Sequence, residues 1–395
     1  MNEIERNIVP WNISAAKRYA AFIKGKESGK KCALYVYEAA DDSTFRYRAY
    51  NVMRYTEESE RWCAQYFFAN TEKDEILQLL PKCELLVLVR VRWTHFVEEM
   101  TTRAHILGKT VLFDADDLVF DLDYLNLVMN TLCIDLRTSV NSDANYDSWF
   151  SYVSRIGLSA SRADGLITTN SYLGRKFTEK FGKPYGVIKN SLGPEQLTVS
   201  EEYVKTKKKR NNFLIGYFSG SPSHINDFLQ IAPEMKDFLD KHPDAKLQVV
   251  GYMELPEFFE PLIRQGRVLS HPFVDFLELQ NLIANVDVNI VPLLINDFTN
   301  CKSELKYFEA AIVDTVTIAT PIYTYSHAIT NGENGFLCNV GEWFDTLERV
   351  YNKDVDIERI NKSAHEHALS VYAGKAMQQE IENCFDFFFQ KQEEK

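Results

Sequence analysis

The stretch "NCKSELKYFEAAIVDTVTIAT", residues 300–320, contains a turn, a helix and a strand in direct succession. Its polar start predicts a turn, and the apolar spacing of "LKYFEAAIV" predicts a helix. "VTIAT" is short and β-branched, as is typical of a buried strand. The turn and helix also carry Lys302, Ser303, Lys306 and Glu309. Charged residues directly ahead of so apolar a strand indicate a binding site.

The same alternation of apolar strands with helices extends through the chain on both sides of this stretch. The predicted strands are "KCALYVYEA", "CELLVLVRV", "KTVLFDADD", "ADGLITTN", "KPYGVIKNS", "FLIGYFSG", "AKLQVVG", "VDVNIVPL", "TVTIAT" and "GFLCN". Alternation of this kind predicts parallel α/β sheets. We therefore expect two Rossmann-like domains facing across a cleft, with ligands bound beyond the carboxyl ends of the strands.

The expected domain limits follow from breaks in this alternation. The first domain is predicted over residues 1–192, the second over 193–364, and a helix over 365–395. Residues 121–156 depart from the pattern and are interpreted as an insertion above the strand ends. Its aromatic side chains either stack on a ligand or form a small core of their own; they are Tyr146, Trp149, Phe150 and Tyr152.

Composition and charge narrow the function classes. The net charge of -12 argues against a general nucleic-acid binder, which needs a basic face. The seven cysteines are dispersed without a C-x-x-C pair, which favours reduced thiols in a cytoplasmic protein. No secretion signal is recognised, and the apolar runs are too short to span a bilayer. "KTKKKR", residues 205–210, is either a solvated loop or a peripheral contact with anionic lipid headgroups.

The stretch "GYFSGSPSH", residues 216–224, is the first candidate ligand site of the second half. A strand ends there, a small-residue turn follows, and a helix begins. Ser219, Gly220 and Ser221 allow a close approach of the backbone, and amides at a helix start favour an anion such as phosphate. The alternative is an ordinary strand–helix turn in which a serine caps the helix.

The quoted segment at residues 300–320 is the second candidate. Ser303 is expected to cap the helix, and Lys302 and Lys306 can reach a phosphate at that end. Glu309 lies about two turns further on, where a carboxylate can bind ribose hydroxyls. The alternative is that the lysines form a solvated face and that Glu309 pairs with one of them at i, i+3.

These segments together resemble the donor domain of retaining glycosyltransferases of the GT-B fold. The resemblance rests on "SELKYFEAAIVDTVTIATPIYTYSHAITNGENGFLC", "HPFVDFLELQNLIANVDVNIVPL", "GYFSGSPSHINDF" and "KPYGVIKNSLG", in that family's order and spacing, and covers residues 160–390. It implies a nucleotide-diphosphate-sugar donor held by the second domain, and a final helix that crosses back onto the first. Glu309 matches the glutamate that binds the donor ribose, and His224 falls where many members place a diphosphate-binding lysine. Lys302, Ser303 and Lys306 would flank the diphosphate.

Two departures from that family's pattern affect this reading. Many members carry a glutamate eight residues before the ribose-binding one, and here that position is Cys301. Many also have a glycine before the next strand, where this chain has "VDTV". The first departure leaves open a different donor sugar, or a non-catalytic carbohydrate-binding partner subunit of a transferase.

The first half supplies candidate acceptor-side residues. "EAADDSTFRYRAYN", residues 38–51, resembles the acceptor-side loop and helix of the GT-B subgroup that makes bacterial surface polysaccharides. Arg46 and Arg48 lie on different helix faces, so only one is expected to point into the cleft, and the alternative is a capped helix with surface arginines. His95 follows a strand and is either a cleft residue or a structural histidine.

"VLFDADDLVFD" introduces a rival interpretation. Asp114, Asp116 and Asp117 end a strand, as in the D-x-D element with which GT-A enzymes hold a divalent metal. A GT-A enzyme would use one compact sheet, whereas this chain has a second α/β series. We interpret the aspartates as acceptor-binding or structural, and expect no metal site. A dehydrogenase is disfavoured because no G-x-G-x-x-G follows either first strand.

The expected activity is sugar transfer from a nucleotide-diphosphate-sugar, with retention and without metal, to a glycan or a lipid-linked oligosaccharide. The nucleotide-sugar is a co-substrate, and no cofactor is expected. No carboxylate stands out as a nucleophile, so the catalytic residue is unassigned, with His95 and Asp116 as weak candidates. The nucleotide base, the sugar, the linkage and the oligomeric state are not predicted.

Overall fold

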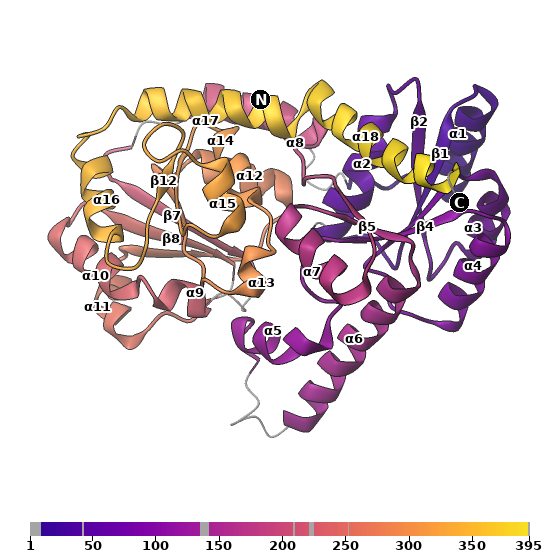
Figure 1. The fold of residues 1–395 in the computed structure, drawn as a ribbon. Coiled ribbons are helices and arrows are strands. Elements are labelled where there is room, and N and C mark those ends of the chain that lie inside the picture. The colour runs from indigo at the N-terminus through magenta and orange to yellow at the C-terminus, as the bar shows by residue number, and fades with distance from the viewer. Residues whose placement is uncertain are drawn as a thin grey trace. The chain divides into compact units, whose positions relative to one another are not determined.

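The computed structural model describes residues 9–41, 43–134, 142–207, 210–220, 225–251 and 253–393. The described residues divide into two compact units. The first draws on Met1–Asn126, Asn141–Gly193 and Tyr372–Lys395, and the second on Leu127–Val140 and Pro194–Val371. Each unit is built around a parallel sheet, which confirms the prediction of an α/β protein with two Rossmann-like domains (Figure 1).

The sheet of the first unit has the strand order β2-β1-β3-β4-β5-β6, with every described neighbour pair parallel. Its strands are β1 (Lys31–Tyr37), β2 (Trp62–Phe68), β3 (Leu85–Val89), β4 (Thr110–Ala115), β5 (Gly165–Thr168) and β6 (Tyr185–Val187). β3 and β4 are buried along their whole length, because helices cover both faces of a parallel sheet. β2 is an edge strand that the sequence pattern did not predict.

The helices of the first unit connect these strands. They are α1 (Ala15–Glu27), η1 (Arg46–Tyr50), α2 (Asn51–Thr56), α3 (Lys73–Leu79), η2 (Leu80–Lys82), α4 (His95–Ile106), η3 (Leu122–Tyr124), α6 (Ser142–Arg162), α7 (Ser171–Phe181) and α18 (Gly374–Glu393), while α5 (Leu125–Thr131) crosses the unit boundary. The stretch "SYLGRKFTEKFG" predicts a short helix closed by Gly182, and α7 confirms it. The Asn170 side chain accepts a hydrogen bond from the Leu173 amide, and Gly182 ends the helix at φ 66°.

The segment predicted as an insertion, residues 121–156, contains η3, α5 and the greater part of α6, while residues 135–141 lie outside the described residues. α6 runs on to Arg162 and joins the crossover from β4 to β5. The predicted aromatic group is carried on this helix. Tyr146 and Phe150 stack with centroids 6.2 Å apart, and Trp149 meets Tyr152 edge-on at 5.7 Å.

The second unit has the strand order β12-β11-β10-β7-β8-β9, again parallel. Its strands are β7 (Leu214–Gly220), β8 (Lys246–Gly251), β9 (Val268–His271), β10 (Val288–Val291), β11 (Val316–Ala319) and β12 (Phe336–Leu337). Its helices are α8 (Pro194–Thr206), α9 (Ile225–Leu229), α10 (Ala232–Lys241), η5 (Glu257–Phe259), α11 (Glu260–Arg264), α12 (Phe276–Ala284), α13 (Asp297–Asn300), α14 (Leu305–Ala311), α15 (Tyr323–Ala328), α16 (Trp343–Tyr351) and α17 (Ile357–Tyr372). The four-residue β9 was not predicted either.

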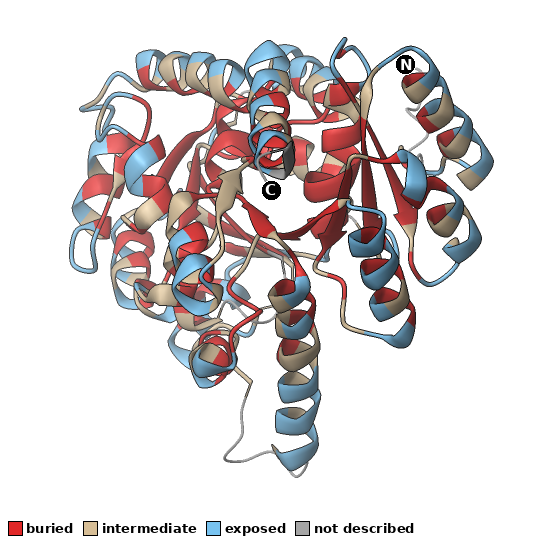
Figure 2. Ribbon diagram, turned by 45° about the vertical axis from the view of Figure 1, so that its right-hand side comes forward, coloured by how far each residue is buried: buried red, intermediate tan, exposed pale blue. Residues whose placement is uncertain are grey.

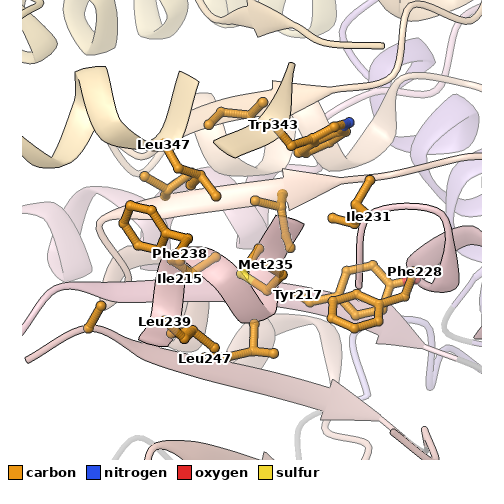
Figure 3. Packing of buried hydrophobic residues seen from close by; sticks show 14 of the residues in the cluster. Ile215, Tyr217, Phe228, Ile231, Met235, Phe238, Leu239, Leu247, Trp343 and Leu347 are labelled. Atoms are coloured by element: carbon orange, nitrogen blue, oxygen red, sulfur yellow. The ribbon is translucent and has the colours of Figure 1, made fainter. Parts of the chain in front are cut away.

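One face of this second sheet carries a hydrophobic core. Figure 3 shows Met235 and Phe238 of α10 lying with Trp343 and Leu347 of α16 against the side chains of β7 and β8. Their spacings of three and four residues place each pair on one helix face. Figure 2 shows the strands buried and the outer helix faces exposed, as this packing requires.

The chain's final segment departs from the prediction of one long helix from residue 365. The structure has two helices, α17 and α18, which are separated at Ala373. Gly374 has a φ of 60°, a left-handed conformation that a continuous α-helix cannot contain. The boundary between the two units falls at this same point, after Val371.

Candidate functional site

The candidate site of the second unit lies at the carboxyl edge of its sheet. β11, β10 and β7 are adjacent, so the segments that follow them emerge side by side. β7 ends at Gly220, and β10 ends at Val291 and leads through α13 into α14. Sheet topology therefore brings the described part of the first predicted segment, residues 216–220, and the start of the second, which follows β10, to one edge.

The end of β7 is distorted at the predicted turn. The pairing register with β8 shifts between Phe218 and Gly220, and Gly220 lies opposite Gly251, whose φ is 101°. Ser219 is buried and hydrogen-bonds with the Tyr217 side chain. A bulge between small residues keeps the backbone open to close approach. The predicted ligand residues Ser221 and His224 lie outside the described residues.

α14 is held by buried amides that the sequence analysis did not single out. Asn289, at the centre of β10, donates through Nδ2 to the carbonyl of Lys306 at 3.0 Å and to Thr317 Oγ1 at 3.1 Å. Gln280 of α12 donates through Nε2 to the carbonyl of Glu309 at 3.3 Å. An asparagine inside the apolar strand "VNIV" was the readable signal, since a buried amide needs polar partners.

The start of α14 differs from the prediction. The helix begins at Leu305, its N-cap residue is Glu304, and no side chain caps it. Ser303 is therefore not the cap, because the chain continues one residue further before it turns helical. Ser303 and Lys302 both lie partly exposed in the segment between α13 and α14. The Lys302 ammonium lies 4.5 Å from the centroid of the Phe298 ring.

Lys306 lies in the first turn of α14, and burial lowers the pKa of its ammonium to about 8. Attraction by Asp227 opposes this shift, while repulsion by Lys302 adds to it. The Lys306 ammonium lies 5.7 Å from the centroid of the Tyr217 ring. Asp227, which the sequence analysis missed, is buried and accepts a hydrogen bond from the Leu294 amide at 2.7 Å. The two lysines therefore repel each other, and the buried carboxylates of Asp227 and Glu309 both attract Lys306.

Glu309 is 3% exposed, and the Gln196 amide of α8 donates to its Oε1 at 3.3 Å. Lys306 forms no ion pair with a described carboxylate, so the alternative in which Glu309 pairs with it at i, i+3 is not observed. Cys301, at the position where the resembled family has a glutamate, is fully buried. A buried thiol cannot act as a carboxylate would toward a sugar hydroxyl.

The predicted aspartates of the first unit form ion pairs with arginines. Arg48 is completely buried and binds Asp114 through two hydrogen bonds, from Nε to Oδ1 at 2.7 Å and from Nη2 to Oδ2 at 3.0 Å. Burial raises the pKa of Asp114 to about 6, against the opposing pull of Arg48. Asp114 has no exposed surface for an acceptor, which corrects its assignment as an acceptor-side residue. Arg46 is also buried, with its guanidinium 4.0 Å from the Tyr47 ring centroid.

Asp116 and Asp117 both face Arg90. Arg90 Nη1 lies 2.9 Å from Asp116 Oδ1 and 3.6 Å from Asp117 Oδ2, and Thr44 donates to Asp116 Oδ2 at 3.0 Å. Burial raises the pKa of Asp116, but Arg90 and Arg48 outweigh it and hold the pKa below its ordinary value. Among the described residues, no group of three or more His, Cys, Asp or Glu side chains is placed to hold a metal. Two sheets and these ion pairs do not fit the GT-A-like alternative.

His95 is the exposed first residue of α4 and lines a cavity of about 480 Å³ in the first unit. The sequence analysis did not predict this cavity. It lies beyond the carboxyl ends of β1, β2 and β3, where Glu38, Asn70 and Arg92 reach it.

No described helix is both long and apolar enough to cross a membrane. Lys208 and Lys209 of the basic loop lie outside the described residues.

A known protein family matches part of the second unit. Residues 212–353 match the family model for glycosyl transferases group 1. The chain has the two-sheet GT-B fold, and the residues that match the family model lie within its second unit. These residues include both segments of the candidate site.

Individual proteins are similar to this chain in sequence or in fold. The chain is 23% identical over 252 residues to the capsular polysaccharide biosynthesis glycosyltransferase CapM of Staphylococcus aureus, an alignment of 61% of this chain and 63% of CapM. A glycosyltransferase from Rickettsia africae has a similar fold, with a TM-score of 0.60 over 91% of this chain and 99% of that chain, at 13% identity. HepE of Anabaena, solved with UDP and glucose, gives a TM-score of 0.57 over 90% of this chain and 100% of HepE, also at 13% identity.

Proposed function

We propose that this protein transfers a sugar from a nucleotide-diphosphate-sugar to a glycan or lipid-linked acceptor, with retention and without metal. The observation that carries the proposal is that the family match and the two lysines fall at the same sheet edge. The group 1 match at residues 212–353 contains the sheet edge at which Lys302 and Lys306 gather. Parallel sheets bind their ligands at this edge, and a diphosphate requires cations there.

The donor contacts follow from the order of groups along that edge. Lys302 and Lys306 bind the diphosphate, and Glu309 binds the ribose hydroxyls one turn further along α14. The backbone at Ser219 and Gly220, with the adjoining Ser221 and His224, approaches the phosphates from β7. The bulge and small residues at the end of β7 support such an approach.

The chemistry rests on charge at the leaving group. When the bond to the anomeric carbon breaks, the nucleoside diphosphate gains negative charge, and the Lys302 and Lys306 ammoniums stabilise it. With a pKa of about 8, Lys306 is about nine-tenths protonated at pH 7 and carries its charge there. The two lysines take the role that a divalent metal fills elsewhere. The leaving phosphate is then the base that accepts the acceptor's proton, so no protein nucleophile is required.

A nucleotide screen is the direct test. We expect one of UDP, GDP, dTDP and ADP to raise the Tm of the intact chain by about 3 °C or more at saturation. UDP is the first choice, because HepE was solved with it. Calorimetry with the selected nucleotide then gives its affinity. If none of the four is bound at millimolar concentration, the proposal fails.

A non-catalytic carbohydrate-binding partner subunit is the second candidate, and Cys301 is the observation that favours it. The buried thiol replaces the carboxylate that many transferases of the resembled family carry there. Hydrolysis of the matching nucleotide-sugar by the purified chain separates the two candidates. A transferase releases nucleoside diphosphate slowly with water as acceptor, whereas a partner subunit binds the nucleotide-sugar without turnover.

A further inference from the structure

The first unit contains a ligand-sized cavity that is independent of the donor edge. It occupies about 480 Å³ beyond the carboxyl ends of β1, β2 and β3, a volume within the usual range for small-molecule sites. The first turn of α4 forms one wall. A second hollow of about 470 Å³ shares Arg92 and Arg155 with the first and is lined by Trp149 and Tyr152 of α6.

Most charges around this cavity are paired with one another. Arg92 donates through Nε to both carboxylate oxygens of Glu38, at 2.9 and 3.0 Å. Glu99 pairs with Arg103 at 2.7 Å. Burial raises the pKa of Glu38, but its hydrogen bonds with Arg92 outweigh this, and the nearby Arg155 adds to them, so the pKa lies below its ordinary value. Both acidic groups of the cavity are therefore already paired with arginines.

Two cations remain without such a partner. Arg155 donates through Nε to the carbonyl of Trp93 at 2.9 Å and forms no ion pair with a described carboxylate. That contact fixes the guanidinium and leaves its terminal nitrogens for a ligand. Lys73, the exposed first residue of α3, also lines the cavity, with its ammonium 5.1 Å from the Phe96 ring centroid and again no ion pair with a described residue. On a chain of net charge -12, this lining carries an excess of positive charge.

We propose that this cavity binds an anionic group of the acceptor, a phosphate or a carboxylate, between Arg155 and Lys73. The sugar ring next to that group rests on Trp149 and Tyr152 in the adjoining hollow. The inference rests on the proposed transferase function and narrows the acceptor to a negatively charged glycan or glycolipid. A guanidinium presents paired donors to phosphate or carboxylate, and a planar aromatic side chain packs against a sugar ring.

The test is calorimetry on the full chain, with the donor site blocked by a saturating amount of the nucleoside diphosphate chosen in the screen. Inorganic pyrophosphate, sodium glucuronate and glucose are the titrants. We expect pyrophosphate or glucuronate to bind, glucose to bind at least tenfold more weakly, and Arg155→Gln and Lys73→Gln each to weaken the anion about tenfold. Arg155→Lys keeps the charge and should lose less. Arg162→Gln removes the same charge from an exposed position on α6 outside the cavity lining and should change nothing.

Each outcome bears on the proposal. Preference for pyrophosphate identifies a phosphate-bearing acceptor, and preference for glucuronate identifies an acidic sugar. Absence of anion binding in the wild-type chain, or equal affinities in wild type, Arg155→Gln and Arg162→Gln, would overturn it. A chain that binds no nucleotide but still binds the anion through Arg155 would refute the transferase proposal and leave the anion site standing.

Discussion

At the residue scale, Lys306 is the most informative group. Its burial favours the neutral amine, whereas its proposed role requires the charged ammonium. Burial in the first turn of α14 lowers the pKa of its ammonium to about 8. A depressed lysine pKa means that the folded state holds this proton more weakly than the unfolded chain does. The diphosphate, in contrast, requires the proton to stay.

The pH dependence therefore has two predicted signs. As pH rises from 7 to 9, nucleotide affinity should fall as Lys306 loses its charge. Over the window from about pH 8 to the ordinary lysine pKa, the contribution of Lys306 to unfolding free energy should rise, because the unfolded chain then binds more protons. Lys306→Gln should weaken nucleotide binding at pH 7 by about tenfold or more and flatten the pH dependence. Calorimetry across pH checks this, with Lys236→Gln on α10 as the control; an unchanged pH profile in Lys306→Gln would contradict it.

Glu309 gives a second residue-scale prediction. Glu309→Gln keeps the side-chain volume but removes the charge that would bind ribose hydroxyls, so nucleoside diphosphate should bind about tenfold more weakly. Inorganic pyrophosphate has no ribose, and its affinity for the donor edge should be unchanged. Calorimetry with both ligands separates the two effects. If both affinities fall equally, Glu309 supports the fold of α14 rather than the ribose.

The sequence predicts the role of a residue well where that role depends on neighbouring positions in the chain. It fails where the partners of the residue are remote in sequence. Gly182 at the end of α7 was read correctly, because a left-handed cap depends on its neighbours alone. Asp114 was read as acceptor-side, whereas its partner Arg48 is remote in sequence and no local pattern announces the pair. Asp227 and Asn289 were missed for the same reason.

At the element scale, glycines reveal which helices are constrained by packing and which by backbone conformation. A Cβ at Gly157 of α6 would lie 2.5 Å from the carbonyl oxygen of Phe120. A Cβ at Gly374, at the start of α18, would meet no atom within 4 Å, but its φ is 60°. α6 is therefore packed closely against the backbone at Phe120, whereas α18 starts from a residue in the left-handed conformation.

These two glycines predict different costs. Gly374→Ala should destabilise the protein by about 1 kcal/mol through backbone strain alone. Gly157→Ala should cost more, about 2–3 kcal/mol, because the clash is with backbone that cannot rotate away. Denaturant unfolding of the first unit measures both. Equal losses of unfolding free energy in the two variants would show that α6 moves to relieve the clash. That result would contradict the close contact between Gly157 and the Phe120 carbonyl.

The two strands that the sequence pattern missed both lie at a sheet edge. β2 and β9 each end the strand order of their sheet. β9 has only four residues, and "WCAQYFF" of β2 reads as well for a buried helix segment as for a strand. The division of the last segment into α17 and α18 was missed because Gly374 alone marks it.

At the scale of the whole molecule, the proposed donor site and the proposed acceptor site belong to different units. The donor edge belongs to the second sheet, and the cavity with Arg155 belongs to the first. If the proposed function and the proposed acceptor site are both correct, transfer needs both units, whereas the donor contacts come from the second unit.

The whole-molecule prediction concerns stereochemistry and metal. Proton NMR of the first-formed product should show the anomeric configuration of the donor sugar, because the proposed mechanism retains it. Activity should survive excess EDTA, since Lys302 and Lys306 balance the diphosphate charge. An inverted product would refute retention, and loss of activity in EDTA that Mg²⁺ or Mn²⁺ restores would refute metal independence.

The sequence by itself determined the alternation of strands and helices, the α/β class and the two candidate segments of the donor edge. These follow from apolar spacing and turn residues, which act over a few neighbouring positions. Only the tertiary structure decided which charges are paired, that Asp114 is enclosed by Arg48, and that Lys73 and Arg155 face one cavity. Such pairings join residues far apart along the chain, and burial makes their energies strong enough to matter only once the fold exists.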